Sequence, residues 1–143
     1  MWIMRTTDPD PVQRRVAVGK EELARATARL NRVDQTLIEL AIQAQVKPLR
    51  ATRFANNGIY YKPLWHRVHI SRALCARLSD DDLRLILAHE IGHASRRTAI
   101  WKTLLDESWR IKEEIRADEI ALRISGATKA DWSRAINATM EAE

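Results

Sequence analysis

Residues 87–94 read LAHEIGHA and hold the pattern His-Glu-x-x-His in a stretch with the apolar spacing of a helix. Residues four apart in an α-helix lie about 40° apart around the axis and about 6 Å apart along it. His89 and His93 should therefore direct their imidazole rings toward one point, with Glu90 beside them. Imidazole nitrogen is a good zinc ligand, so this spacing predicts a metal site in which Glu90 is a general base and not a ligand.

A catalytic zinc ion takes three protein ligands and keeps one open position, so a third donor is needed on another element. Glu114 follows His93 by 21 residues, which is enough for the chain to turn and return as a second helix. Asp118 lies four residues later on the same helix face. We predict Glu114 as the third zinc ligand and Asp118 as a carboxylate that hydrogen-bonds an imidazole N–H of His89 or His93.

Other acids lie close to this segment, and Glu113 is the first alternative to Glu114, followed by Glu107 and Glu119. Gly92 costs about 1 kcal/mol relative to Ala in the middle of a helix. Its presence suggests that the helix carrying Glu114 approaches closely at this point.

The rest of the chain predicts an α+β fold, mostly helical with a small mid-chain sheet. Residues 1–19 hold Pro9 and Pro11 and show no helical period, so we expect an extended or mobile arm, followed by one domain over 20–143. Apolar residues three and four apart predict a helix over 20–46, packed on the core or forming a coiled-coil seam with a second copy. Strands are expected at 49–54, 59–62 and 64–70, and further helices at 71–78, 80–97, 107–125 and 129–140.

The predicted sheet has two features that bear on function. Asn56, Asn57 and Gly58 are residues that a tight hairpin turn favours. The strand over 64–70 is expected to form the rim of the cleft, where an extended substrate could add as a further strand.

The segment from 59 to 126 resembles the gluzincin metallopeptidases, and within them the family of HtpX-type and CAAX-prenyl proteases. The resemblance rests on VHIS at 68–71, LSDDDL at 78–83, LAHEIGH at 87–93 and EIRAD at 114–118. It implies a zincin-like domain whose active-site helix carries both histidines. In that family both histidines and the first acid of Glu-x-x-Ala-Asp bind zinc, which corresponds to His89, His93 and Glu114, with Glu90 catalytic.

This resemblance implies a zinc-dependent metalloendopeptidase that holds one Zn²⁺ per chain and acts on protein or peptide substrates. Glu90 would take a proton from the zinc-activated water and carry it to the leaving amine. The residue that stabilises the oxyanion is not placed by the resemblance. Candidates are Arg123, Arg134, His66, His69, Tyr60 and Tyr61.

Two other functional classes compete with this interpretation. One is a latent or inactive zinc-bearing binding module, in which an end of the chain covers the cleft. The other is a basic helical protein that binds nucleic acid, suggested by 24 Lys and Arg against 19 Asp and Glu. Because the Arg residues are dispersed and interleaved with acids, the charge pattern argues against a nucleic-acid surface.

The length and composition of the chain also bear on the number of domains and on where the protein is located. The 143 residues suit one domain, and the single cysteine, Cys75, is expected to be a buried apolar residue. Family members are often embedded in membranes, but no segment here approaches the roughly 20 apolar residues that span a bilayer. With no signal-peptide pattern either, we expect a cytoplasmic, soluble minimal catalytic domain. The five tryptophans are expected to pack on the core.

Overall fold

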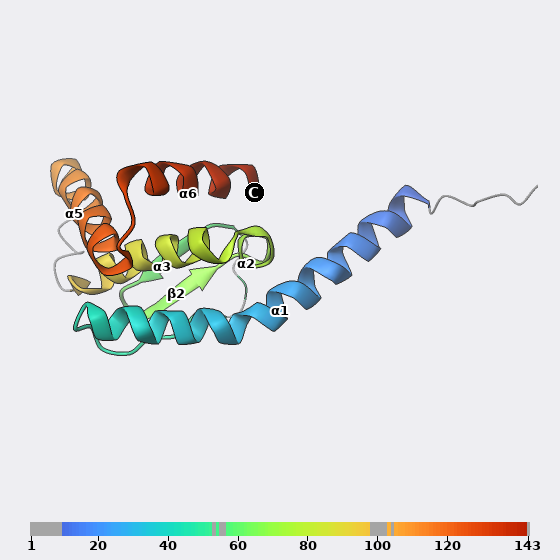
Figure 1. The fold of residues 1–143 in the computed structure, drawn as a ribbon, viewed down its shortest axis with the longest axis horizontal. Coiled ribbons are helices and arrows are strands. Elements are labelled where there is room, and N and C mark those ends of the chain that lie inside the picture. Colours follow the sequence, from blue (N-terminus) through green and yellow to red (C-terminus); the bar gives the residue numbers. More distant parts are fainter. Residues whose placement is uncertain (1–9, 53, 55–56, 98–102, 104, 143) are drawn as a thin grey trace, which may run out of the picture.

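A computed structural model describes residues 10–52, 54, 57–97, 103 and 105–142. Its helices are α1 (Pro11–Gln43), α2 (Arg72–Arg77), α3 (Asp80–Ala94), α5 (Glu107–Ser125) and α6 (Lys129–Ala142), and its strands are β1 (Ile59–Lys62) and β2 (Arg67–Ile70). The strands form a small antiparallel hairpin in the middle of a mostly helical chain (Figure 1). The predicted α+β class is confirmed.

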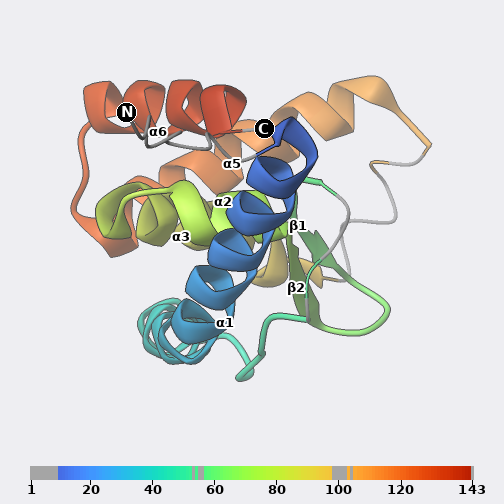
Figure 2. The same cartoon turned by 90° about the vertical axis from the view of Figure 1, so that its right-hand side faces the viewer.

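Helix α3 lies at the centre and contacts α1, β1, α5 and α6. Figure 2 shows α1 on one side of it and α6 on the other. Ser79 caps α3 by accepting a hydrogen bond from the Asp82 N–H at 3.1 Å. Leu87, Ala88 and Ile91 are fully buried, so the later turns of α3 are enclosed by the neighbouring elements.

Helix α1 begins at Pro11, so an extended conformation is wrong for residues 11–19 of the arm expected to be extended or mobile. Residues 1–9 lie outside the described part. Asp10 caps the helix by accepting from the Val12 N–H, and proline at the first helical position has no N–H to lose. The second half of α1 packs on the core. Its first half projects from the body (Figure 1) and leaves Val12 and Val16 exposed. Self-association through this helix stays a prediction.

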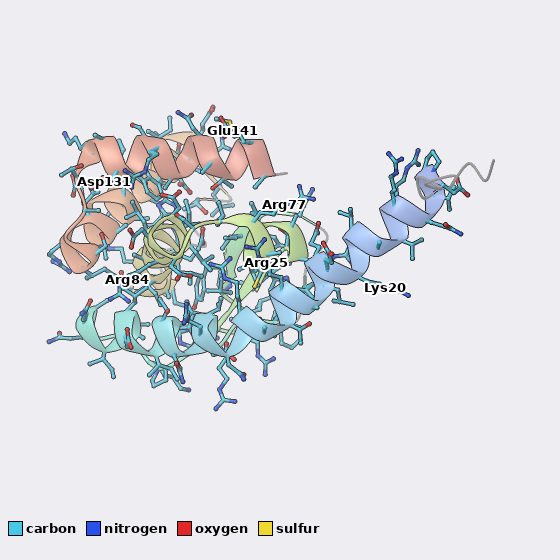
Figure 3. All side chains as sticks on the ribbon, turned by 45° about the vertical axis from the view of Figure 1, so that its right-hand side comes forward. Lys20, Arg25, Arg77, Arg84, Asp131 and Glu141 are labelled. Carbon is cyan, nitrogen blue, oxygen red and sulfur yellow. The ribbon has the colours of Figure 1, made fainter. Side chains whose placement is uncertain are left out.

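Ion pairs fasten α1 to the body near the point where it leaves the core. Glu22 binds Arg77 at 2.7 Å and Arg72 at 3.3 Å, and Arg29 binds Asp80 at 2.9 Å. Charges of both signs are spread over the surface, as Figure 3 shows for labelled residues such as Lys20 and Asp131. This distribution agrees with the expected dispersal of the basic residues.

The sheet differs from the prediction in two respects. Among its described residues, the 49–54 segment forms no strand. It makes only one isolated parallel bridge, between Ala51 and Val68 of β2. The β1–β2 hairpin turns at residues 63–66, where His66 takes a φ of 49°, and not at the predicted 56–58 turn. Gly58 does have a positive φ of 75°, but it precedes β1; Asn56 lies outside the described residues.

The two last helices match their predicted ranges closely. Gly126 ends α5 in the left-handed conformation with a φ of 70°. Cys75 is buried, as expected, whereas Trp65 and Trp109 are exposed and do not pack on the core. None of the helices in the described ranges combines the length and the apolar character needed to cross a bilayer.

Candidate metal and catalytic site

His89 and His93 of α3 meet Glu114 of α5 at one point, as the spacing predicts. The two Nε2 atoms lie 3.1 Å apart, and each lies 3.1 Å from an oxygen of the Glu114 carboxylate. Tetrahedral zinc with bonds of 2.0–2.1 Å would separate its ligand atoms by about 3.3 Å. Two imidazoles and one carboxylate at this spacing could hold a metal ion, and the donor set suits zinc.

The outer ring nitrogens explain why both Nε2 atoms can face the same point. Asp118 Oδ1 lies 2.7 Å from Nδ1 of His89, and Glu113 Oε1 lies 3.3 Å from Nδ1 of His93. The first contact is short but poorly aligned, since this Nδ1 is buried without a proper hydrogen bond. The carboxylates favour a proton on each Nδ1, so in the neutral rings the Nε2 lone pairs are directed at each other. Converging lone pairs repel unless a proton or a metal cation lies between them.

Electrostatics at the cluster favour positive charge. Burial lowers the pKa of His89, but the carboxylates of Asp118 and Glu114 outweigh burial and raise this pKa to about 10. The hydrogen bonds with His89 and His93 in turn hold the pKa of Glu114 well below its usual range. The imidazoles are largely buried, with 10% and 13% of their side chains exposed, whereas 56% of Glu114 is exposed. The site is therefore anchored inside and open to solvent on the Glu114 side.

The close packing of α5 on α3 depends on Gly92. A Cβ atom at Gly92 would lie 2.8 Å from the Cα and 2.9 Å from the carbonyl oxygen of Ala117. No side chain fits in that space, which accounts for glycine in mid-helix as the sequence suggested. Ala117 lies one turn from Glu114 and next to Asp118, so this contact fixes where along α3 the side chains of both acids lie.

Glu90 is buried beside the cluster and is held by the main chain of β1. Its Oε2 accepts a hydrogen bond from the Tyr61 N–H at 2.7 Å. Burial raises the pKa of Glu90, although the neighbouring histidines oppose this shift. A carboxyl group so placed can exchange a proton with a molecule at the cluster.

The strand beside the site is β1, so the prediction that the strand at 64–70 forms the rim of the cleft is wrong. Strand β2 pairs with β1 on one side and with Ala51 on the other. The Ser71 N–H donates to the Gly58 carbonyl, so in the alternating antiparallel pattern the main-chain groups of Ile59 and Tyr61 face away from β2. They border a cavity of about 400 Å³ that reaches His89, Glu90 and Glu114.

The candidates for an oxyanion-stabilising residue differ in whether they line the 400 Å³ cavity. Tyr60 and Tyr61 line it, whereas His66 does not line it and forms a hydrogen bond with the Tyr61 hydroxyl. His69, on β2, contacts the Tyr60 ring. Arg123 and Arg134 do not line this cavity; Arg134 lies beside Asp82 and Asp131 instead.

Two residues of the site were missed by sequence reasoning. Trp132 of α6 stacks on the His89 ring, with ring centroids 5.0 Å apart and planes 21° from parallel. Only the packing of the last helix brings it there, so no local pattern could have identified it. Arg110 lines the cavity and precedes Glu114 by one helical turn, a spacing that could have placed it on the same face.

Comparison with known proteins adds one family. No match was found among curated proteins or among solved structures. The model of Peptidase family M48, whose members are metallopeptidases, matches residues 29–108. This match spans just over half of the chain and includes the helix with His89, Glu90 and His93, but it ends before Glu114. The roles predicted for Glu114 and Asp118 thus rest on the geometry of the site and on the EIRAD sequence at 114–118, and not on the family match. The matched region and the three-residue cluster together lead to one conclusion: the chain belongs to peptidase family M48.

Proposed function

We propose that the protein is a zinc-dependent endopeptidase of the gluzincin type. His89, His93 and Glu114 would hold one zinc ion, and Glu90 would act as general base. The observation that carries this proposal is the convergence of two Nε2 atoms and two carboxylate oxygens at 3.1 Å, with a buried acid beside them. Bound zinc would polarise a water molecule and lower its pKa toward about 7.

The residues around the cluster would have different roles in hydrolysis. Tyr61 holds one oxygen of Glu90 through its N–H, which leaves the other oxygen to take the proton of the attacking water. Burial keeps Glu90 basic enough to accept this proton and then to release it to the leaving amine. Asp118 and Glu113 keep the histidine rings in orientation.

An extended peptide would lie along β1. The main-chain groups of Ile59 and the carbonyl of Tyr61 face the cavity and can pair with a substrate strand. Such pairing depends on the main chain of the substrate, so it gives affinity without strong selection of its side chains. This arrangement brings a scissile carbonyl past Glu90, next to β1.

The test combines metal analysis with turnover of an unfolded protein substrate. Wild type should bind one zinc per chain and cleave, and Glu90→Gln should keep the zinc but lose about 10²–10⁴ in kcat, as expected for a lost general base. His93→Ala should lose the zinc. A Glu90→Gln variant as active as wild type would contradict the mechanism. A wild type that binds zinc without any turnover would instead favour the binding module.

A further inference from the structure

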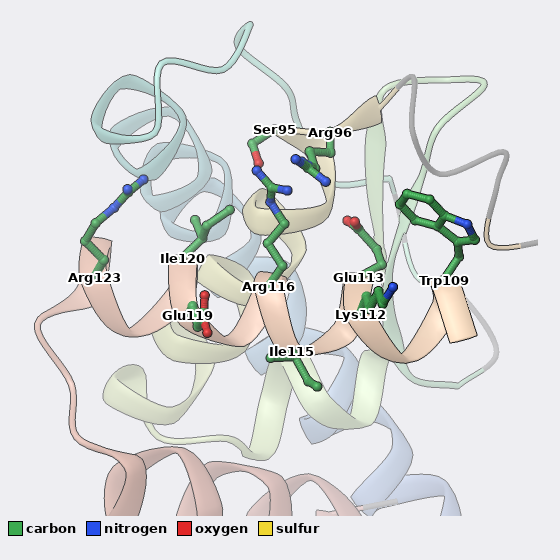
Figure 4. A pocket seen from close by; sticks show the side chains of 10 residues that line it. All are labelled: Ser95, Arg96, Trp109, Lys112, Glu113, Ile115, Arg116, Glu119, Ile120 and Arg123. Atoms are coloured by element: carbon green, nitrogen blue, oxygen red, sulfur yellow. The ribbon is translucent and has the colours of Figure 1, made fainter. Parts of the chain in front are cut away.

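A second and larger cavity lies between the end of α3 and the outer face of α5 (Figure 4). Its volume is about 850 Å³, and it is wide open to solvent. Four cationic side chains line it, one from the turn after α3 and three from α5: Arg96, Lys112, Arg116 and Arg123. The lining acids are Glu113 and Glu119, so positive charge is in excess.

These four cations are not neutralised by ion pairs. In the part of the chain that the structure describes, none of them makes a salt bridge, whereas Arg29, Arg72 and Arg77 near α1 all do. The Nε atom of Arg116 is buried and has no hydrogen-bond partner. Because this Nε atom is shielded from solvent, an occupant of the cavity would not reach it, but the four cations around the cavity repel each other. An anionic occupant would remove this repulsion.

The spacing of the cations indicates an extended occupant. From Lys112 to Arg123 the helix rises about 16 Å, which is the length of about five extended residues of a peptide. A single phosphate or carboxylate would contact only one end of this row. Ile120 lies between Arg116 and Arg123, and Trp109 lies at the Lys112 end of the row, with the Lys112 Nζ 5.5 Å from its ring centroid. Both offer apolar surface to the side-chain stems of a polypeptide.

The larger cavity adjoins the candidate catalytic cavity. Glu113 lines both, and its Oε1 also lies 3.3 Å from the ring of His93. A peptide held in one cavity can therefore continue into the other around the first turns of α5.

We infer that the cavity formed by Arg96, Lys112, Arg116 and Arg123 binds an acidic stretch of the peptide substrate, several residues away from the bond that is cleaved. This inference rests on the proposed peptidase function and adds a substrate class to it. Substrates with a run of Asp and Glu beside an unstructured cleavage segment would be preferred, because the run docks on α5 while the cleavage segment lies along β1.

The test compares two fluorogenic peptides with the same cleavage segment. One carries a tail of about five Glu residues behind a flexible linker of about six, which spans about 20 Å when extended, and the other carries a Gln tail. Wild type should show a KM roughly tenfold lower for the Glu peptide, the sum of several exposed ion pairs, and the advantage should shrink with added salt. The double variant Lys112→Glu/Arg123→Glu should lose the preference and cleave the Gln peptide at the wild-type rate. Both changed residues are exposed, so the fold should tolerate the change.

The matched control is Arg15→Glu/Arg25→Glu, which changes the net charge by the same amount. Both residues are exposed on α1, and neither lines the cavity. It should keep the preference for the Glu peptide. Equal KM values for both peptides in wild type, or an undiminished preference in the Lys112/Arg123 variant, would overturn the inference.

A binding assay separates this inference from the proposed catalysis. If neither peptide is cleaved, the proposed function fails, but anisotropy of a labelled Glu-tailed peptide still tests the docking site. Weaker binding by the Lys112/Arg123 variant than by the Arg15/Arg25 control supports it, and equal binding rejects it. Tighter binding of a single-stranded oligonucleotide of the same charge would assign the cavity to nucleic acid and overturn the inference.

Discussion

The Tyr61 N–H donates a 2.7 Å hydrogen bond to Oε2 of Glu90, so a main-chain group of β1 holds the proposed general base. The register of the hairpin, with Tyr61 opposite Val68, turns this N–H toward α3. A slip of one residue would turn it toward β2. The position of the acid is thus set by strand pairing and not by any side chain of β1.

Replacing Tyr61 with Phe should therefore leave kcat/KM within about threefold of wild type. The Tyr61 hydroxyl bonds His66 Nδ1 at 2.7 Å, and His66 Nε2 lies 2.8 Å from the Lys47 carbonyl, so the hydroxyl is the donor in a chain leading away from the site. Its loss should cost about 1 kcal/mol of unfolding free energy, seen by denaturant titration. A hundredfold loss of kcat would instead show that the hydroxyl acts on the reacting atoms.

Zinc affinity should separate Glu114 from Glu113. Glu114→Ala removes an oxygen from the cluster and should weaken zinc binding by more than about 100-fold, measured by competition with a chelator. Glu113→Ala removes only a contact to the outer nitrogen of His93, so a loss of about 10–100-fold is expected. The reverse order would make Glu113 the third ligand.

Asp118→Asn tests the orientation of His89. The amide keeps the size of the carboxylate but not its charge, so His89 loses the group that favours a proton on Nδ1. Zinc affinity should fall about 10–100-fold, while the variant should still bind one zinc at saturation. Unchanged affinity would show that the 2.7 Å contact plays no part in metal binding.

Gly92→Ala should destabilise the protein although alanine is the better helix former. The new Cβ would meet the Ala117 backbone at 2.8 Å, which forces α5 away and costs about 1–3 kcal/mol. Zinc binding should weaken too, because Glu114 moves with α5. Gly19→Ala is the matched control: nothing lies within 4 Å of its Cβ, so it should stabilise α1 by up to about 1 kcal/mol. Stabilisation by both would rule out the close contact.

Glu22 should make stability depend on pH in the acid range. The hydrogen bond from Arg77, and after it Arg72, lowers its pKa from 4.5. A carboxyl with a lowered pKa stabilises the fold above its unfolded value and loses this contribution as the pH falls through the folded value. Glu22→Gln should cost about 1 kcal/mol or less at pH 7, and in thermal unfolding the difference from wild type should shrink as the pH falls below 4.5 and vanish below the folded-state pKa. A difference that persists in acid would assign it to packing.

The parts of the fold that sequence predicted are those with local causes. The position of His89 opposite His93 follows from helical geometry, and Ser79 and Gly126 mark helix ends by their own chemistry. The resemblance to the HtpX-type and CAAX-prenyl proteases agrees with the family match. The zinc ligands, the division at residue 20 and the cytoplasmic location stay predictions. The predicted start of the first helix, at residue 20, is wrong because Pro11 does not break the helix: after Asp10 it is a favourable first residue.

The remaining features depend on contacts between distant segments. Strand pairing selected 63–66 as the hairpin turn over a better turn sequence at 56–58, because the turn must fit the register that buries Val68 and Ile70. The stacking of Trp132 on His89 and the row of cations beside Arg96 need the placement of α6 and α5. No periodicity within one element contains that information.

The projection of α1 beyond the body gives the molecule a gradient of local stability. Before Glu22, whose ion pairs join the helix to α2, the apolar residues Val12, Val16 and Val18 are exposed, and Ala26 is the first fully buried residue of α1. Isolated helices of about 15 residues are marginal in water, so amide protons there should exchange with solvent fastest at the Pro11 end. Exchange should slow abruptly at Glu22, which binds Arg72 and Arg77 of α2. These ion pairs would then mark the boundary between the part of α1 that unfolds locally and the stable body that carries the metal ligands.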